Sequence, residues 1–185
     1  MLSTRTITLV TFTLAAAITR LLPHPPNVTP IAAMALFGGV QFGDRRVAFA
    51  VPLSAMLLSD VLLGFWPHPV MPFVYGSFAA IVGLGRAIRG RRSAIPIAAA
   101  ALAGSILFFV LTNLGDWLVG ALYPRTWEGL LACYVAAIPF FGRTVAGDAL
   151  YAGLLFGGFA LAERRFVLPR DTARLERAGS GAGSP

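Results

Sequence analysis

Residues 94–122 read AIPIAAAALAGSILFFVLTNLGDWLVGAL, and their only charged residue is Asp116. A helix needs about 20 apolar residues to cross a hydrocarbon core about 30 Å thick, so this stretch predicts a transmembrane helix. The rest of the chain has the same character, because 57% of its 185 residues are hydrophobic and 12% are charged. An average soluble domain is about 45–50% apolar and about 25% charged. The sequence therefore predicts an integral membrane protein.

Further apolar runs divide the chain into a predicted all-α bundle of six transmembrane helices, in one domain over residues 1–165. A short extra segment at 127–141 is expected to be helical or re-entrant. The run at 30–42 is short for a span, so a re-entrant form is an alternative for it. Besides 94–122, the runs lie at 6–22, 30–42, 47–65, 70–88 and 144–162.

Arginine placement predicts the orientation. All fifteen basic residues are Arg. With six spans, twelve of them share one side, and the positive-inside rule makes that side cytoplasmic, together with both termini. The net charge of +7 is thereby interpreted as a topology signal and not as a nucleic-acid surface. The opposite side holds Arg20, Arg125 and Arg143, and the cytoplasmic side holds Arg5, Arg45, Arg46, Arg86, Arg89, Arg91, Arg92, Arg164, Arg165, Arg170, Arg174 and Arg177.

The two ends of the chain carry different signals. The N-terminal STRTITLVTFTLAAA has the basic start, apolar middle and small-residue end of a signal peptide, so cleavage is an alternative to retention as the first span. Residues 166–185 are polar, end in RAGSGAGSP, and predict a disordered cytoplasmic tail.

Polar residues within the predicted spans gather toward the outer side. An ionisable group in lipid costs about 2.5–3.5 kcal/mol on insertion scales, so such groups face the interior of a bundle or a water-filled cleft. The proline-rich loop PHPPNVTP is expected to cross the outer mouth as a semi-rigid strap. We therefore predict an outward-facing small-molecule site made by His24, Asn27, Asp60, Asn113, Asp116, Asp148 and Tyr151.

A purely structural role is an alternative interpretation of these residues. Asp60 and Asp148 could pair with Arg20 and Arg143 and brace the outer ends of the helices. Two loop histidines, His24 and His68, have no fixed separation, so no metal site and no cofactor is predicted. Cys133 lies in an apolar run and is expected to be a small buried residue.

Small residues four apart predict close helix packing in lipid. Such pairs are Ala35 with Gly39, Ala99 with Ala103, and Gly153 with Gly157. They could pack the bundle internally or dock a partner.

Several motifs resemble a known family. LFGGVQFG (36–43), VPLSAMLLSDVLLGF (51–65) and FVYGSFAAIVGLGR (73–86) are similar to the second to fourth spans of the substrate-binding S components of energy-coupling factor (ECF) transporters. LFFVLTNLGDW (107–117) and GDALYAGLLFGGFALAERR (147–165) resemble the fifth and sixth spans. Over residues 20–165 the chain more closely resembles an uncharacterised bacterial family of small six-span membrane proteins. Marks of that family are RLLPHPPNVTPIAAMALFGG (20–39) and YPRTWEGLLACYVAAIPFF (123–141).

The resemblance to S components implies vitamin uptake across the bacterial cytoplasmic (inner) membrane. The protein would capture a vitamin-like small molecule from outside and would work with an ECF coupling subunit and ATPases. S components dock through small residues such as AxxxA in the first span, and a strict AxxxA is absent here. A protein that works alone therefore stays an alternative.

Two other classes of function compete with substrate binding. A structural or assembly protein needs its aspartates only as braces. An intramembrane enzyme would use an aspartate with a histidine as acid and base, but the sequence has no nucleophile elbow, HExxH or CxxC motif. No GxxxxGK[ST] motif is present either, so we expect a protein without catalytic activity of its own.

Overall fold

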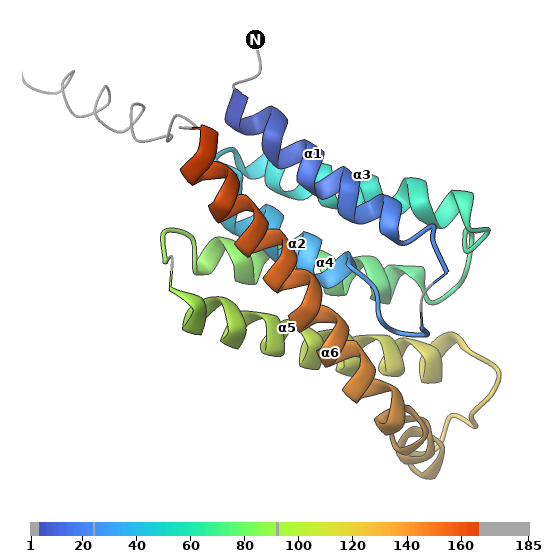
Figure 1. The fold of residues 1–185 in the computed structure, drawn as a ribbon. Helices are drawn as coiled ribbons and strands as arrows, with labels where there is room; N and C mark the ends of the chain where they lie inside the picture. Colours follow the sequence, from blue (N-terminus) through green and yellow to red (C-terminus); the bar gives the residue numbers. More distant parts are fainter. Residues whose placement is uncertain (1–3, 24, 92, 167–185) are drawn as a thin grey trace, which may run out of the picture.

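The computed structural model describes residues 4–23, 25–91 and 93–166, and within them the chain forms six α-helices and no strand. Consecutive helices run in opposite directions, so that their connections gather at two ends of the bundle (Figure 1). The all-α prediction is confirmed. The helices are α1 (Thr4–Thr19), α2 (Ile31–Gln41), α3 (Arg45–Leu62), α4 (Met71–Ala87), α5 (Ala94–Val119) and α6 (Trp127–Phe166).

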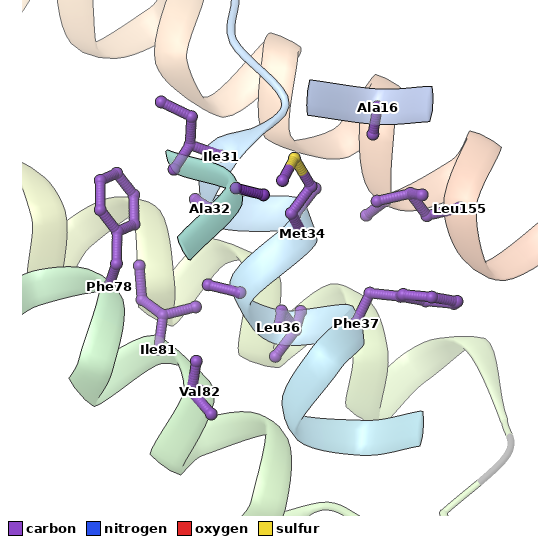
Figure 2. Close-up of a cluster of buried hydrophobic side chains, with 14 of the residues drawn as sticks. Ala16, Ile31, Ala32, Met34, Leu36, Phe37, Phe78, Ile81, Val82 and Leu155 are labelled. Carbon is purple, nitrogen blue, oxygen red and sulfur yellow. The ribbon is translucent and has the colours of Figure 1, made fainter. Parts of the chain in front are cut away.

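The short helix α2 forms the centre of the bundle. Every residue from Ile31 to Val40 is buried, and α2 contacts all five other helices. Figure 2 shows its side chains between Leu155 of α6 on one side and Ile81 of α4 on the other. A helix that is hydrophobic all round is either in the core of a protein or in contact with lipid, and this one is enclosed by protein. Its 11 residues rise about 16 Å, so α2 is much shorter than a hydrocarbon core.

Glycines bring α2 and α4 into backbone contact. A Cβ on Gly85 would lie 2.5 Å from the carbonyl oxygen of Leu36, and one on Gly39 would collide with the carbonyl oxygen of Val82. The predicted small-residue pair at Ala35 and Gly39 therefore packs inside the bundle. The other two pairs do not, because Ala99 and Ala103 are exposed and a Cβ on Gly153 or Gly157 would meet nothing within 4 Å.

Three arginines hold the C-terminal end of α2. Arg5 donates to the carbonyl oxygen of Gln41 at 3.0 Å, Arg86 to that of Phe42 at 3.1 Å, and Arg89 to that of Gly43 at 2.8 Å. The last carbonyls of a helix lack intrahelical partners, and the helix dipole favours cations there. We call this contact the arginine hub (Arg5, Arg86, Arg89). These arginines, interpreted from the sequence as topology signals, also hold helices together.

Helix α6 is longer than predicted. Residues 127–141 are helical, but they are continuous with 144–162 in one helix of 40 residues, which is about 60 Å long. The prediction of a separate segment is therefore wrong. Pro139 removes one backbone donor and crowds the carbonyl of Val135, which disturbs the helix locally without ending it. Figure 1 shows α6 crossing the bundle diagonally, and α6 contacts α5, α2 and α1 in turn.

The outside of the bundle is apolar. Helices α5 and α6 are long and apolar enough to cross a membrane, and only 17% and 28% of their most apolar windows are buried within the protein. Large exposed side chains such as Ile18, Leu62 and Leu154 extend this surface over α1, α3 and α6. Helix α3 has 18 residues but holds three charged ones, Arg45, Arg46 and Asp60. The predicted tail at 166–185 lies outside the described residues except for Phe166, the last residue of α6.

Candidate functional site

Asp60 lies at the end of the bundle opposite the arginine hub and is fully paired. Its side chain is 1% exposed. One carboxylate oxygen forms an ion pair with Nη2 of Arg20 at 2.5 Å, and the other accepts a hydrogen bond from the hydroxyl of Tyr75 at 2.8 Å. Arg20 also donates to Oγ of Ser59 at 2.6 Å. We call these four residues the Arg20–Asp60 cluster (Arg20, Ser59, Asp60, Tyr75).

The Arg20–Asp60 cluster joins three helices. Arg20 directly follows α1, Ser59 and Asp60 belong to α3, and Tyr75 belongs to α4. The guanidinium also lies over the ring of Phe65, 5.7 Å from its centroid. Buried charges need partners and hydrogen bonds, and here each charge has both. The alternative in which Asp60 pairs with Arg20 is therefore the one that the structure adopts.

Asp148 of α6 is buried in different surroundings. It is 4% exposed, and Oγ of Ser105 on α5 donates to Oδ2 at 2.6 Å. Among the described residues, no arginine or histidine forms an ion pair with it. The alternative pairing with Arg143 is not formed. Asp148 is thus a buried carboxylate whose partner in the described part of the chain is a hydroxyl and not a cation.

A small void lies beside Asp148 where four helices meet. Its walls are small or apolar, and the space within them is too narrow to hold a water molecule. The contributing helices are α2, α4, α5 and α6. The state of the protein seen here is therefore closed around Asp148. The lining residues are Ala32, Ala33, Leu36, Ile81, Ala101, Gly104 and Asp148.

The proline-rich loop passes directly over this position. A Cβ added to Gly147 would lie 2.9 Å from Cα of Val28, so the loop backbone packs on the residue before Asp148. Asn27 is exposed and has a φ of 66°, a left-handed conformation that asparagine tolerates better than most residues. The predicted site residue His24 lies outside the described residues. The loop covers α6 at Asp148, and Asn27 faces away from the protein interior.

Other predicted site residues lie elsewhere on α5 and α6. Asn113 donates to the carbonyl of Phe109 in its own helix at 2.8 Å, and Asp116 is half-buried. They follow Ser105 by about 12 Å and about 16 Å along α5, at 1.5 Å per residue. Tyr151 is one turn from Asp148, and its hydroxyl accepts a hydrogen bond from Thr19 at 3.4 Å. The structure therefore divides the predicted residues among several places.

A metal site is absent from the described part of the chain. No three His, Cys, Asp or Glu residues there lie close enough to hold an ion. Cys133 is buried, and its Sγ lies 3.5 Å from the carbonyl oxygen of Asn113.

Comparison with known proteins gives a family but no activity. A family model described as a family of unknown function, DUF6580, matches residues 1–173. The chain belongs to DUF6580. No curated protein matches it, and no solved structure does. Membership in DUF6580 does not identify a substrate, so the resemblance to S components stays a prediction.

Sequence reasoning missed three polar partners in this DUF6580 chain. Tyr75, Ser59 and Ser105 supply the hydroxyls that contact Arg20 and the two buried aspartates. A serine next to Asp60 in the middle of an apolar run was a usable signal for Ser59. Ser105 stood in the small-residue run ALAGS and gave no such signal, because serine is also a common packing residue in membrane helices.

Proposed function

We propose that the protein is a membrane-embedded binding protein that captures a vitamin-like small molecule from the outer face for uptake. The observation that carries this proposal is Asp148, a buried carboxylate with no cationic partner among the described residues, beneath the 20–30 loop. An ionisable residue inside a membrane bundle is costly and is a candidate functional group by default. Its hydrogen-bond partner on α5, Ser105, would orient the carboxylate toward a ligand.

We infer that the chain crosses the bacterial cytoplasmic membrane six times, with both termini in the cytoplasm, and that the short α2 makes its crossing together with the 20–30 loop, enclosed by the other helices. The apolar exterior supports embedding in lipid. The orientation is supported by the arginines: the hub and the exposed Arg45, Arg46 and Arg91 lie at one end, and the Arg20–Asp60 cluster lies at the other. Under the positive-inside rule the arginine-rich end is cytoplasmic, so Asp148 and the loop above it belong to the outer half.

The ligand class follows from the walls of the void. The single carboxylate of Asp148 favours a protonated amine or a neutral hydrogen-bond donor, and the alanine, leucine and isoleucine side chains favour a small apolar body. Because the void is closed, binding needs α2 to separate from α5 and α6, or the loop to lift from Gly147. Uptake would be driven by an ECF coupling subunit with ATPases, as the resemblance implies, or by the protein alone.

A structural role is the second candidate, and the Arg20–Asp60 cluster favours it. A protein that served only to brace or assemble other membrane proteins would need paired charges and no open cavity. In that case Asp148 would be a helix-packing residue held by Ser105.

The test compares small molecules released from gently purified wild-type protein with those released from Asp148→Asn. Asp116→Asn is the matched control, because it makes the same chemical change on a half-buried aspartate away from the void. We expect a stoichiometric compound in wild type and D116N, and none in folded D148N. A wild-type protein that releases nothing, and whose midpoint of thermal unfolding is unchanged across a panel of vitamins, would support the structural role.

A further inference from the structure

A group of exposed arginines surrounds the arginine hub. Arg45, Arg46 and Arg91 are exposed, and none of them forms a hydrogen bond or ion pair through its side chain within the described residues. The two acidic residues described at this end are already engaged. Asp44 caps α3 by accepting from the backbone N–H of Arg46 at 2.7 Å, and Glu163 lies 3.6 Å from Nε of Arg5. This end therefore carries a surplus of positive charge.

The hub brings these arginines together from two turns. Arg86 and Arg89 donate to the carbonyls of Phe42 and Gly43, which draws the turn after α4 onto the turn before α3. Arg45 and Arg46 follow Gly43 by two and three residues, and Arg91 follows Arg89 by two. The positive charges are thus concentrated by a fixed backbone contact.

An apolar surface begins within one helical turn of Arg91 along the sequence. Ile95, in the first turn of α5, is 81% exposed, and it is four residues from Arg91. A soluble anion such as phosphate makes no favourable contact with a neighbouring isoleucine side chain. A phospholipid has a charged headgroup and acyl chains that continue from it, so it matches both parts.

We propose that Arg45, Arg46 and Arg91 form a binding site for the headgroup of an anionic phospholipid, with an acyl chain along Ile95. Lysine and arginine near a negatively charged leaflet each contribute to lipid binding, and basic pockets between membrane helices hold anionic headgroups. The site depends on the membrane placement of the proposed function, but it does not depend on any ligand at Asp148. It gives the cytoplasmic end of the bundle a fixed lipid contact through the hub.

The test counts lipids bound to the full-length protein by native mass spectrometry, in a neutral detergent titrated with phosphatidylglycerol or with phosphatidylcholine. The variant Arg46→Gln with Arg91→Gln removes one exposed arginine from each turn. Arg125→Gln with Arg143→Gln is the matched control, because it removes the same charge from exposed residues away from the hub. We expect roughly fivefold weaker phosphatidylglycerol binding for each of the two exposed arginines removed beside the hub, and no change in the control.

Three results would overturn the proposal. They are equal binding of phosphatidylglycerol and phosphatidylcholine, equal weakening in the two variants, and complete competition by inorganic phosphate at millimolar concentration. The last result would identify a site for any anion. Because D148N leaves the hub unchanged, loss of its small molecule with intact phosphatidylglycerol binding would separate the two sites.

Discussion

Asp60 and Asp148 are both buried aspartates, but their surroundings differ. Asp60 has an arginine on one oxygen and a tyrosine hydroxyl on the other, and its cluster joins α1, α3 and α4. Asp148 has one serine hydroxyl and lies beside a closed apolar void at the junction of α2, α4, α5 and α6. The first arrangement has the features of a brace. In the second, Ser105 is the one hydrogen-bond donor to the carboxylate within residues 4–23, 25–91 and 93–166, which suits a group that binds a ligand.

The largest expected effect comes from removing the cation of Asp60. Arg20→Gln leaves the carboxylate buried without its charge partner, and breaking one side of a buried pair costs about 3–5 kcal/mol. We expect a large drop in the midpoint of thermal unfolding of the purified protein. The double variant Arg20→Met with Asp60→Leu removes both charges and should recover most of the stability, since paired apolar replacements are often neutral. An R20Q protein as stable as wild type would contradict the brace.

A smaller effect is expected from Tyr75→Phe. This change keeps the ring and removes the hydroxyl that donates to Asp60 at 2.8 Å. Loss of a hydrogen bond to a charged group costs about 1.5–3 kcal/mol, and interhelical bonds in membranes are worth somewhat less. Thermal unfolding should report a loss of about 1–2 kcal/mol. Tyr134→Phe, which loses a hydroxyl bond to the carbonyl of Val110, is the control for an uncharged acceptor and should lose less.

Ser105→Ala gives the smallest expected change in stability. It removes the donor to Asp148 and leaves a side chain of similar size, so the cost should be about 0.5–1 kcal/mol. The affinity for the ligand should fall more clearly, because the carboxylate loses its orientation. Unchanged content of bound small molecule in S105A, measured by mass spectrometry, would argue against a role for Ser105 in positioning Asp148.

The sequence was sufficient to predict the six-helix, all-α organisation, because long apolar runs separated by Arg- or Pro-containing turns indicate helices directly. It could not place α2 at the centre. The run at 30–42 is as apolar as the others, and only the three-dimensional contact of Gly39 with Gly85 and the surrounding helices makes it an interior helix. The continuity of α6 was missed because 127–141 and 144–162 were treated as separate apolar runs, whereas one helix continues through both.

The candidate site was predicted only in part. Position in an apolar run indicates position along a helix, and Asp60 lies near the end of α3 whereas Asp148 lies near the middle of α6. The position of a residue in a run does not predict which helix faces contact each other. For that reason the Arg20 partner of Asp60 stayed one of two alternatives, and Asn113 and Asp116 were grouped with residues from which the structure separates them along α5.

The most direct test of the difference between the two aspartates is thermal unfolding of Asp60→Asn and Asp148→Asn, side by side in the same membrane mimetic. Each variant replaces a carboxylate with an amide of the same shape. We predict that D60N unfolds at a markedly lower temperature, because Arg20 loses its charge partner, whereas D148N unfolds at or above the wild-type temperature. Equal destabilisation of the two variants would contradict the account and would make Asp148 a second brace.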